Sequence, residues 1–167
     1  MSALRHLVAI LLLPFTVTVV VPRFLLSALA AADTRWGDAA AAGAGRAAGA
    51  ALLVAGLALF AWCVALFARV GRGTLAPWDP TRALVAAGPY RLTRNPMITG
   101  VAAILVGEAL WMGSRVLGGW AAVFIVINHL YFVLSEEPGL ERRFGEGYRA
   151  YRAAVPRWLP RPRRRAE

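Results

Sequence analysis

The sequence predicts an all-α membrane protein: a polytopic bundle of about four transmembrane helices with a cytoplasmic loop and a C-terminal amphipathic helix. Of its 167 residues, 59% are hydrophobic and only 17% are charged, and the mean hydropathy is +0.56. A soluble domain carries about 25% charged residues. The net charge of +10 would suit a nucleic-acid-binding protein, but such a protein would not need long apolar runs. The length allows one domain, which we take as residues 1–167.

Four apolar stretches approach the roughly 20 residues that a helix needs to cross a bilayer. The first contains Pro14 and Pro22, which predict a kink, and its apolar core is too long for a cleaved signal peptide. The second has no charge, the third is short and carries Glu108, and the fourth contains Asn128 and His129. We expect interhelical hydrogen bonding from these two polar residues, with a functional role as the alternative. The predicted spans are residues 7–32, 47–68, 96–113 and 116–134.

Basic residues set the predicted orientation. All 19 are arginines, and most lie in the loop of residues 69–95 and the tail of residues 135–167. Because basic residues concentrate on the cytoplasmic side, we expect this loop, this tail and both termini to be cytoplasmic. The lysine-free, alanine-rich composition points to a GC-rich bacterial genome, and therefore to a bacterial cytoplasmic membrane.

The tail has a helical rhythm of apolar residues. Leu140, Phe144, Tyr148 and Tyr151 follow one another at i, i+4, i+8 and i+11, which places them on one face of a helix. This amphipathic helix could lie on the membrane surface with its arginines toward anionic headgroups. Alternatively, it could pack as a lid over the cytoplasmic helix ends.

The start of the third span predicts an anion site. Asn95 suits an N-cap and Pro96 suits the first helical position, so a helix should begin here. A helix N-terminus binds carboxylates and phosphates, and Arg91 and Arg94 beside it would strengthen that binding. Gly100 would let a flat group approach the backbone. The alternative is a capped helix with arginines at the membrane interface.

Glu136 and Glu137 directly follow the fourth span, where adjacent carboxylates need a cationic partner. That partner is either a nearby arginine or a cationic ligand. Together with the anion site, the pair would suit a zwitterionic cofactor with an extra cationic centre. No metal site is predicted, because Cys63 is the only cysteine and the two histidines lack ligand spacing.

From about residue 71 to residue 160, the chain resembles the superfamily of isoprenylcysteine carboxyl methyltransferases and phospholipid methyltransferases, which are membrane enzymes. Six motifs in this order carry the resemblance: Arg82-Ala-Leu-Val85, Gly88-Pro-Tyr90, Arg94-Asn-Pro-Met-Ile-Thr-Gly100, Glu136-Glu137, Phe144-Gly-Glu-Gly-Tyr148-Arg-Ala-Tyr151 and Val155-Pro-Arg-Trp-Leu-Pro160.

The resemblance implies S-adenosyl-L-methionine as cofactor, bound by an Arg-His-Pro-x-Tyr-x-Gly element and a glutamate pair. Asn95 stands where the family has histidine, and Ile98 stands where it has tyrosine. Asparagine keeps a hydrogen-bonding cap but cannot act as a base. Glu136 is the candidate catalytic residue. The cofactor-binding residues implied are Arg82, Leu84, Val85, Tyr90, Arg94, Asn95, Pro96, Met97, Ile98, Gly100, Glu136 and Glu137.

The implied activity is methyl transfer to a lipophilic or membrane-embedded acceptor, either an isoprenylcysteine-type carboxylate or a phospholipid-like headgroup. Phe132 occupies the position of a substrate-binding arginine, which weakens the case for the prenylcysteine carboxylate. The expected partners are this acceptor and membrane lipids, with no nucleic acid and no metal. The alternative is a non-catalytic membrane protein that retains the methyltransferase fold.

Overall fold

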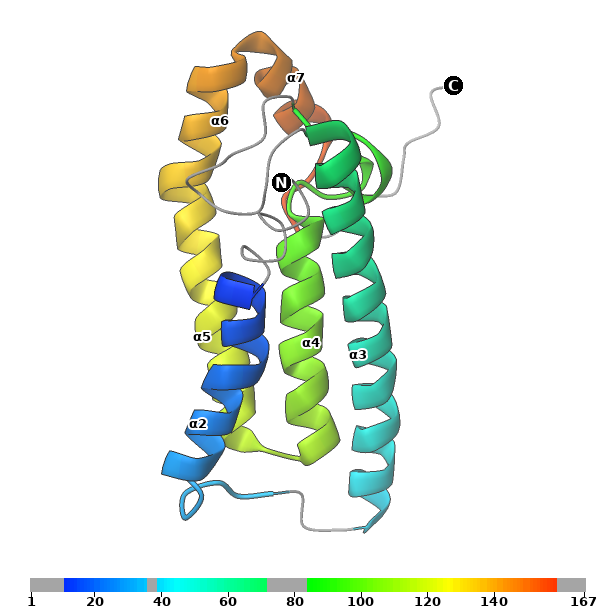
Figure 1. The fold of residues 1–167 in the computed structure, drawn as a ribbon, viewed down its shortest axis with the longest axis vertical. Helices are drawn as coiled ribbons and strands as arrows, with labels where there is room; N and C mark the ends of the chain where they lie inside the picture. The colour runs from blue at the N-terminus through cyan, green and yellow to red at the C-terminus, as the bar shows by residue number, and fades with distance from the viewer. Residues whose placement is uncertain (1–10, 36–38, 72–83, 159–167) are drawn as a thin grey trace.

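The computed structural model describes residues 11–35, 39–71 and 84–158, and this part of the chain is helical, with no strands. Its main helices run side by side along the long axis of the molecule (Figure 1). Two of them, Ala41–Arg69 and Arg115–Phe144, are long and apolar enough to cross a membrane. Two shorter apolar helices, Leu13–Ala28 and Pro96–Met112, accompany them. The described part therefore confirms the all-helical prediction.

The first helical segment changes from a π-helix to an α-helix between its two prolines, and the predicted kink stays a prediction. A π-helix, η1 (Leu11–Val20), contains Pro14 and leads into α2 (Val21–Ala28), where Pro22 occupies the first turn. Proline is tolerated in a first turn because the amide proton it lacks has no partner there. The Trp120 indole nitrogen donates to the Val17 carbonyl over 3.1 Å, which ties this segment to α5 (Arg115–Tyr131).

Helix α3 (Ala39–Leu66), which continues into the π-helix η2 (Phe67–Gly71), packs closely against α4 (Pro96–Met112). Glycines face one another along this contact. A Cβ atom on Gly49 would lie 2.7 Å from the Gly107 carbonyl oxygen, and one on Gly56 would lie 2.7 Å from that of Gly100. Small residues let helix backbones approach closely. Helix α3 begins at Ala39 rather than near residue 47, because its alanines favour helix.

The end of the bundle away from the predicted cytoplasmic face is closed by a tight turn. Gly113 ends α4 in the left-handed conformation, and the Ser114 hydroxyl caps α5 by accepting from the Leu117 amide. Asp33 accepts from the Ser114 hydroxyl at 2.8 Å and from the Val116 amide at 3.2 Å. A carboxylate at a helix N-terminus is favoured by the unpaired amides and the helix dipole.

Helix α5 continues without interruption through η4 (Phe132–Glu136) into α6 (Glu137–Phe144). These 30 residues extend about 45 Å, whereas the hydrocarbon core is about 30 Å thick. About ten residues must therefore project beyond the core. The predicted span of residues 116–134 would make residues 135–144 the projecting part and would leave the glutamate pair outside the hydrocarbon.

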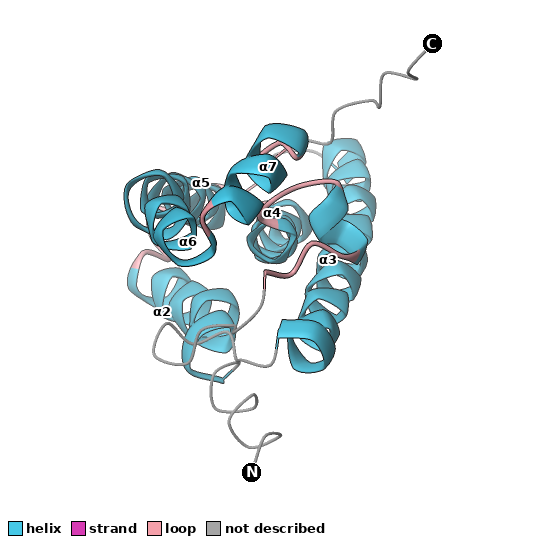
Figure 2. Cartoon of the chain, turned by 90° about the horizontal axis from the view of Figure 1, so that it is seen from above, coloured by secondary structure: helices cyan, strands magenta, loops and turns pink. Residues whose placement is uncertain are grey.

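The prediction of a single C-terminal amphipathic helix is wrong. Gly145, with φ +54° and ψ −128°, breaks it into α6 and α7 (Glu146–Ala154). This backbone conformation is essentially restricted to glycine, so the chain turns here although its apolar spacing continues. Helix α7 folds back over the end of the bundle (Figure 2), as in the lid interpretation.

Candidate functional site

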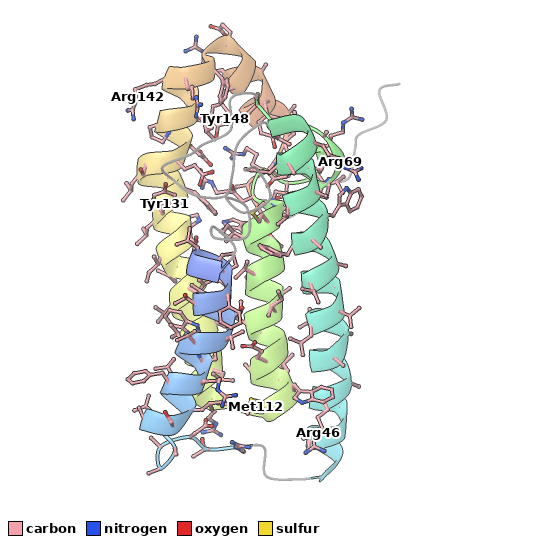
Figure 3. All side chains as sticks on the ribbon, in the orientation of Figure 1. Arg46, Arg69, Met112, Tyr131, Arg142 and Tyr148 are labelled. Atoms are coloured by element: carbon pink, nitrogen blue, oxygen red, sulfur yellow. The ribbon has the colours of Figure 1, made fainter. Side chains whose placement is uncertain are left out.

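The predicted site residues that are described gather at the end of the bundle where α4 begins. Around this end lie the segment of residues 84–95, the helices η4, α6 and α7, and a C-terminal segment of residues 155–158 that we call the clasp. Tyr148 and Arg142 lie at this end, and Arg46 and Met112 lie at the other (Figure 3). Arg82 lies outside the described residues.

Asn95 and Pro96 begin α4 as predicted, with Asn95 at the N-cap position. The Asn95 side chain makes no capping hydrogen bond, and its Nδ2 is buried without a partner in the described part of the chain. The Thr99 hydroxyl instead donates to the Asn95 carbonyl at 2.9 Å. The N-terminus of α4 therefore offers an amide donor that no other described residue uses.

Arg94 lies beside this N-terminus and is largely buried, with 11% of its side chain exposed. Its Nη1 is 2.8 Å from Glu137 Oε1. Its Nε is buried and has no hydrogen-bond partner among the described residues. Arg91, by contrast, is exposed and donates to the Ala86 carbonyl, so it is not part of this cluster.

Glu137 is the anchor of an ion-pair network. Arg157 donates to its two carboxylate oxygens at 2.7 and 3.0 Å, in addition to the Arg94 contact. Burial would raise the pKa of Glu137, but the hydrogen bonds and charges of Arg157 and Arg94 hold that pKa below its ordinary value. Glu137 is therefore a charged group whose partners the protein supplies.

Glu136 is in a different state. It is half-buried and has no ion-pair or hydrogen-bond partner in the part of the chain that the structure describes. Burial, together with the negative charge of Glu137, raises its pKa to about 7. Two adjacent carboxylates thus differ sharply, and only Glu136 is left to meet a cationic group.

Three tyrosines, Tyr90, Tyr148 and Tyr151, lie close together at this end of the bundle. Tyr148 of α7 is almost completely buried, with 1% of its surface exposed, and burial raises its pKa. The Tyr151 hydroxyl donates to the Tyr90 carbonyl at 2.7 Å, which fixes α7 to the loop before α4. Burial also raises the pKa of Tyr90, and the negative charge of Glu136 adds to that rise. These phenols therefore stay protonated and act as hydrogen-bonding and aromatic surfaces.

The clasp packs against the residues that precede α4. The Arg94 amide donates to the Pro156 carbonyl at 2.9 Å, and the Thr93 hydroxyl donates to the Arg157 carbonyl at 2.7 Å. The chain thus brings its C-terminal segment against the start of α4, more than 60 residues away in sequence. The sequence placed Arg157 only in the cytoplasmic tail of residues 135–167 and in the Val155-Pro-Arg motif of the resemblance, and it did not indicate the contact with Glu137.

The remaining predicted residues mostly pack against protein. Val85 is buried with Cys63 and Tyr90, whereas Leu84 is half-buried. Gly100 lies against the backbone of Gly56, so in this structure its missing side chain serves helix packing. Pro96 is fully buried, and the side chains of Met97 and Ile98 pack against the apolar core. The cofactor contacts expected of all these residues are predictions.

Unused polar atoms define what this end of the bundle can bind. Arg94 Nε and Asn95 Nδ2 are buried donors without partners among the described residues, next to a helix N-terminus. The Glu136 carboxylate, close enough to Tyr90 to act on its pKa, has no cationic partner among the described residues. Buried polar groups are normally paired, so these atoms fit a ligand with both an anionic and a cationic group. A bound amino acid moiety has this combination.

Comparisons with known proteins agree with the sequence resemblance. Residues 44–147 match the model of a family described as phospholipid methyltransferase. A curated protein of Haemophilus influenzae, described only as uncharacterized, is 36% identical over 56 residues, which is 34% of this chain and 89% of that protein. No solved structure matches.

Proposed function

The chain belongs to the phospholipid methyltransferase family, and from that premise we propose that it transfers a methyl group from S-adenosyl-L-methionine to a lipid-like acceptor in the membrane. The observation that carries this proposal is the contrast between Glu137, which Arg94 and Arg157 neutralise, and Glu136, which has no described partner. A site that served only to hold the fold together would not need the second carboxylate.

The unused atoms fit the polar end of the cofactor. Arg94 Nε, Asn95 Nδ2 and the N-terminus of α4 would hold its carboxylate. Glu136 would hold a cationic centre. The cofactor would supply a methyl group bonded to a positively charged sulfur, and the acceptor atom would attack this methyl group in line with the sulfur as the leaving group.

The protein's own contribution is alignment and exclusion of water, since no nucleophilic side chain is needed. Helix α7 supplies the cover, because Tyr148 is buried beneath it and Tyr151 binds the Tyr90 carbonyl. Asn95 cannot accept a proton, whereas the Glu136 carboxylate can hold one near neutral pH. Glu136 is thus the candidate to take up a proton that the acceptor releases.

The proposed membrane arrangement has four spans, with the two shorter apolar helices completing the two long ones. Both termini, the loop of residues 69–95 and the tail of residues 135–167 would be cytoplasmic, in a bacterial cytoplasmic membrane. The support is the arginine distribution and the position of α6 and α7 at the same end as the start of α4 (Figure 1).

A second candidate is a non-catalytic membrane protein with the same fold. The observation that favours it is the closed network of Arg94, Glu137 and Arg157, which stabilises this end without any ligand. The replacement of the family's histidine by Asn95 points in the same direction. Cofactor binding without transfer to any acceptor would support this candidate.

The test uses full-length protein purified in detergent. Equilibrium binding of labelled S-adenosylmethionine is measured for the wild type, Glu136→Gln and Arg94→Ala, with Arg142→Ala as an exposed arginine control. We expect the wild type to bind the cofactor. Both site variants should weaken this binding at least tenfold, and the control should leave it unchanged. Labelled methyl transfer is then measured with phospholipids, prenylated peptides and small thiols. No cofactor binding by the wild type would overturn the proposal.

A further inference from the structure

Arg157 lies between two anchored residues of the clasp. On one side, the Pro156 carbonyl accepts from the Arg94 amide at 2.9 Å. On the other side, Trp158 Nε1 donates to His129 Nδ1 over 3.1 Å, so the polar His129 side chain of α5 is held by the clasp. These two contacts fix the backbone from which the Arg157 side chain extends.

The Arg157 guanidinium satisfies both oxygens of the buried Glu137 carboxylate. Its Nε donates to Oε1 at 2.7 Å and its Nη2 donates to Oε2 at 3.0 Å, which is the forked geometry in which arginine binds a carboxylate. Only 8% of the Glu137 side chain is exposed, so water can do little to stabilise its charge. One arginine is therefore enough to neutralise Glu137, and its charge does not require a second one.

Arg94 is nevertheless a second arginine at this carboxylate, and it uses few of its donors there. Its Nη1 lies 2.8 Å from Glu137 Oε1, yet neither Nη1 nor Nε has a hydrogen-bond partner among the described residues. Both nitrogen atoms are buried. Because buried donors are normally paired, a guanidinium with two such donors fits an anion from outside the chain.

We propose that Arg157 is a positioning residue for cofactor binding: it occupies Glu137 and thereby keeps the Arg94 guanidinium free for the carboxylate of S-adenosylmethionine. Without Arg157, Arg94 is the only described cation at a buried negative charge, and it turns to bind both oxygens of Glu137 itself. Glu137 is then a positioning residue as well. This inference rests on the proposed function, because it concerns how the same site takes up the cofactor.

Two ligands separate this role from a purely structural one. S-adenosylmethionine and its decarboxylated analogue share the adenosine, the sulfonium and the amine, and they differ in the carboxylate that Arg94 would bind. Equilibrium dialysis with full-length protein in detergent at pH 8, where most Glu136 is ionised, gives the affinity ratio of the two ligands. We expect Arg157→Ala to lower this ratio roughly tenfold, by weakening only the binding of S-adenosylmethionine.

Arg94→Ala should lower the ratio at least as far, and Arg142→Ala, an exposed arginine, should leave it unchanged. Arg157→Lys keeps the positive charge and one hydrogen bond, so it should retain part of the ratio. Arg157→Ala combined with Glu137→Gln removes the buried charge that draws Arg94 away, and should restore the wild-type ratio even if Arg157→Ala alone folds poorly. Equal weakening of both ligands in Arg157→Ala, or a ratio that the double variant does not restore, would refute the inference.

The cofactor-free protein gives an independent measurement. In NMR spectra of protein with isotope-labelled arginine side chains, the Nε–H signal of Arg94 is the one that Arg94→Ala removes. It should shift in Arg157→Ala, because the guanidinium gains acceptors, and stay in place in Arg142→Ala. An unchanged signal in Arg157→Ala would contradict the proposed control of Arg94.

The two proposals fail separately. If the wild type binds no S-adenosylmethionine, the proposed function fails, while the NMR shift still reports whether Arg157 keeps Arg94 free. If the cofactor binds and Arg94→Ala lowers the affinity ratio but Arg157→Ala does not, only the positioning role fails. A lower ratio in both variants supports both proposals.

Discussion

Arg157 donates two hydrogen bonds, of 2.7 and 3.0 Å, to the Glu137 carboxylate, although the two residues lie 20 positions apart on different structural segments. Arg94 approaches the same carboxylate to 2.8 Å from the start of α4. One buried carboxylate thus joins the end of α5–α6, the loop before α4 and the clasp. The position of Glu136, the next residue, depends on this junction.

Removal of Arg157 should therefore loosen the site end of the bundle. In Arg157→Ala the buried Glu137 keeps only one cationic partner, and we expect a loss of about 2–3 kcal/mol in the free energy of unfolding. Equilibrium unfolding in mixed micelles measures it. The control is Arg152→Ala, a half-exposed arginine 3.1 Å from Glu141, which should cost less than about 1 kcal/mol. Equal losses would show that the Glu137 junction has no special weight.

Local patterns in the sequence predicted much of this arrangement. The Asn95-Pro96 helix start and the pairing of a glutamate with Arg94 were both foreseen, the first as an N-cap and the second as one of two partners for the carboxylates. Arg157 was missed as a site residue, because no short-range spacing connects it with Glu137. The reversal at Gly145 was missed because hydrophobic periodicity counts residues and is blind to backbone angles. Glycine at a helix end was the available signal.

The state of Glu136 predicts how cofactor binding depends on pH. With its pKa raised to about 7 in the free protein, Glu136 is mostly protonated and neutral below pH 7 and carries a negative charge above it. A cationic group on the ligand favours the charged form, so affinity should fall as the pH falls. At pH 6 only about a tenth of the protein has the carboxylate ionised, which predicts roughly tenfold weaker binding than at pH 8.

The groups nearest to Glu136 do not account for such a change. Arginine side chains in general stay charged over this range, Glu137 has a lowered pKa and Tyr90 has a raised pKa. Binding measured by equilibrium dialysis from pH 5.5 to 8.5 should therefore lose its slope near neutral pH in Glu136→Gln. A slope of the same size in that variant would assign the titration to another group.

The glycine contact between α3 and α4 predicts a sharp difference between two alanine substitutions. A Cβ atom on Gly49 would lie 2.6 Å from the Trp111 amide nitrogen and 2.7 Å from the Gly107 carbonyl oxygen, which forces the two backbones apart. We expect Gly49→Ala to lower the free energy of unfolding by about 1–3 kcal/mol. Gly118→Ala on α5 meets nothing within 4 Å and should be neutral or stabilise by about 0.5–1 kcal/mol, since alanine favours helix. Thermal unfolding in detergent that ranks the two equally would contradict close α3–α4 packing.

The glycine at the α6–α7 junction predicts a specific effect on the cover of the site. Gly145 has φ +54° and ψ −128°, so an alanine at this position should introduce about 1–3 kcal/mol of backbone strain. We expect the chain to relieve this strain by displacing α7, while the bundle stays folded. Hydrogen–deuterium exchange should then rise in residues 146–154 and at the Tyr90 loop, which α7 holds through Tyr151, while exchange in α3 and α4 stays unchanged.

Gly147→Ala is the matched control, because Gly147 lies within α7 at a helical position where an added Cβ atom would meet nothing within 4 Å. It should leave exchange in residues 146–154 unchanged or slow it. If α7 covers the bound cofactor, Gly145→Ala should also speed its dissociation, whereas Gly147→Ala should not. Faster exchange without faster dissociation would be consistent with the fold but would refute the lid role of α7. A lid that opens more often must release the bound cofactor more often.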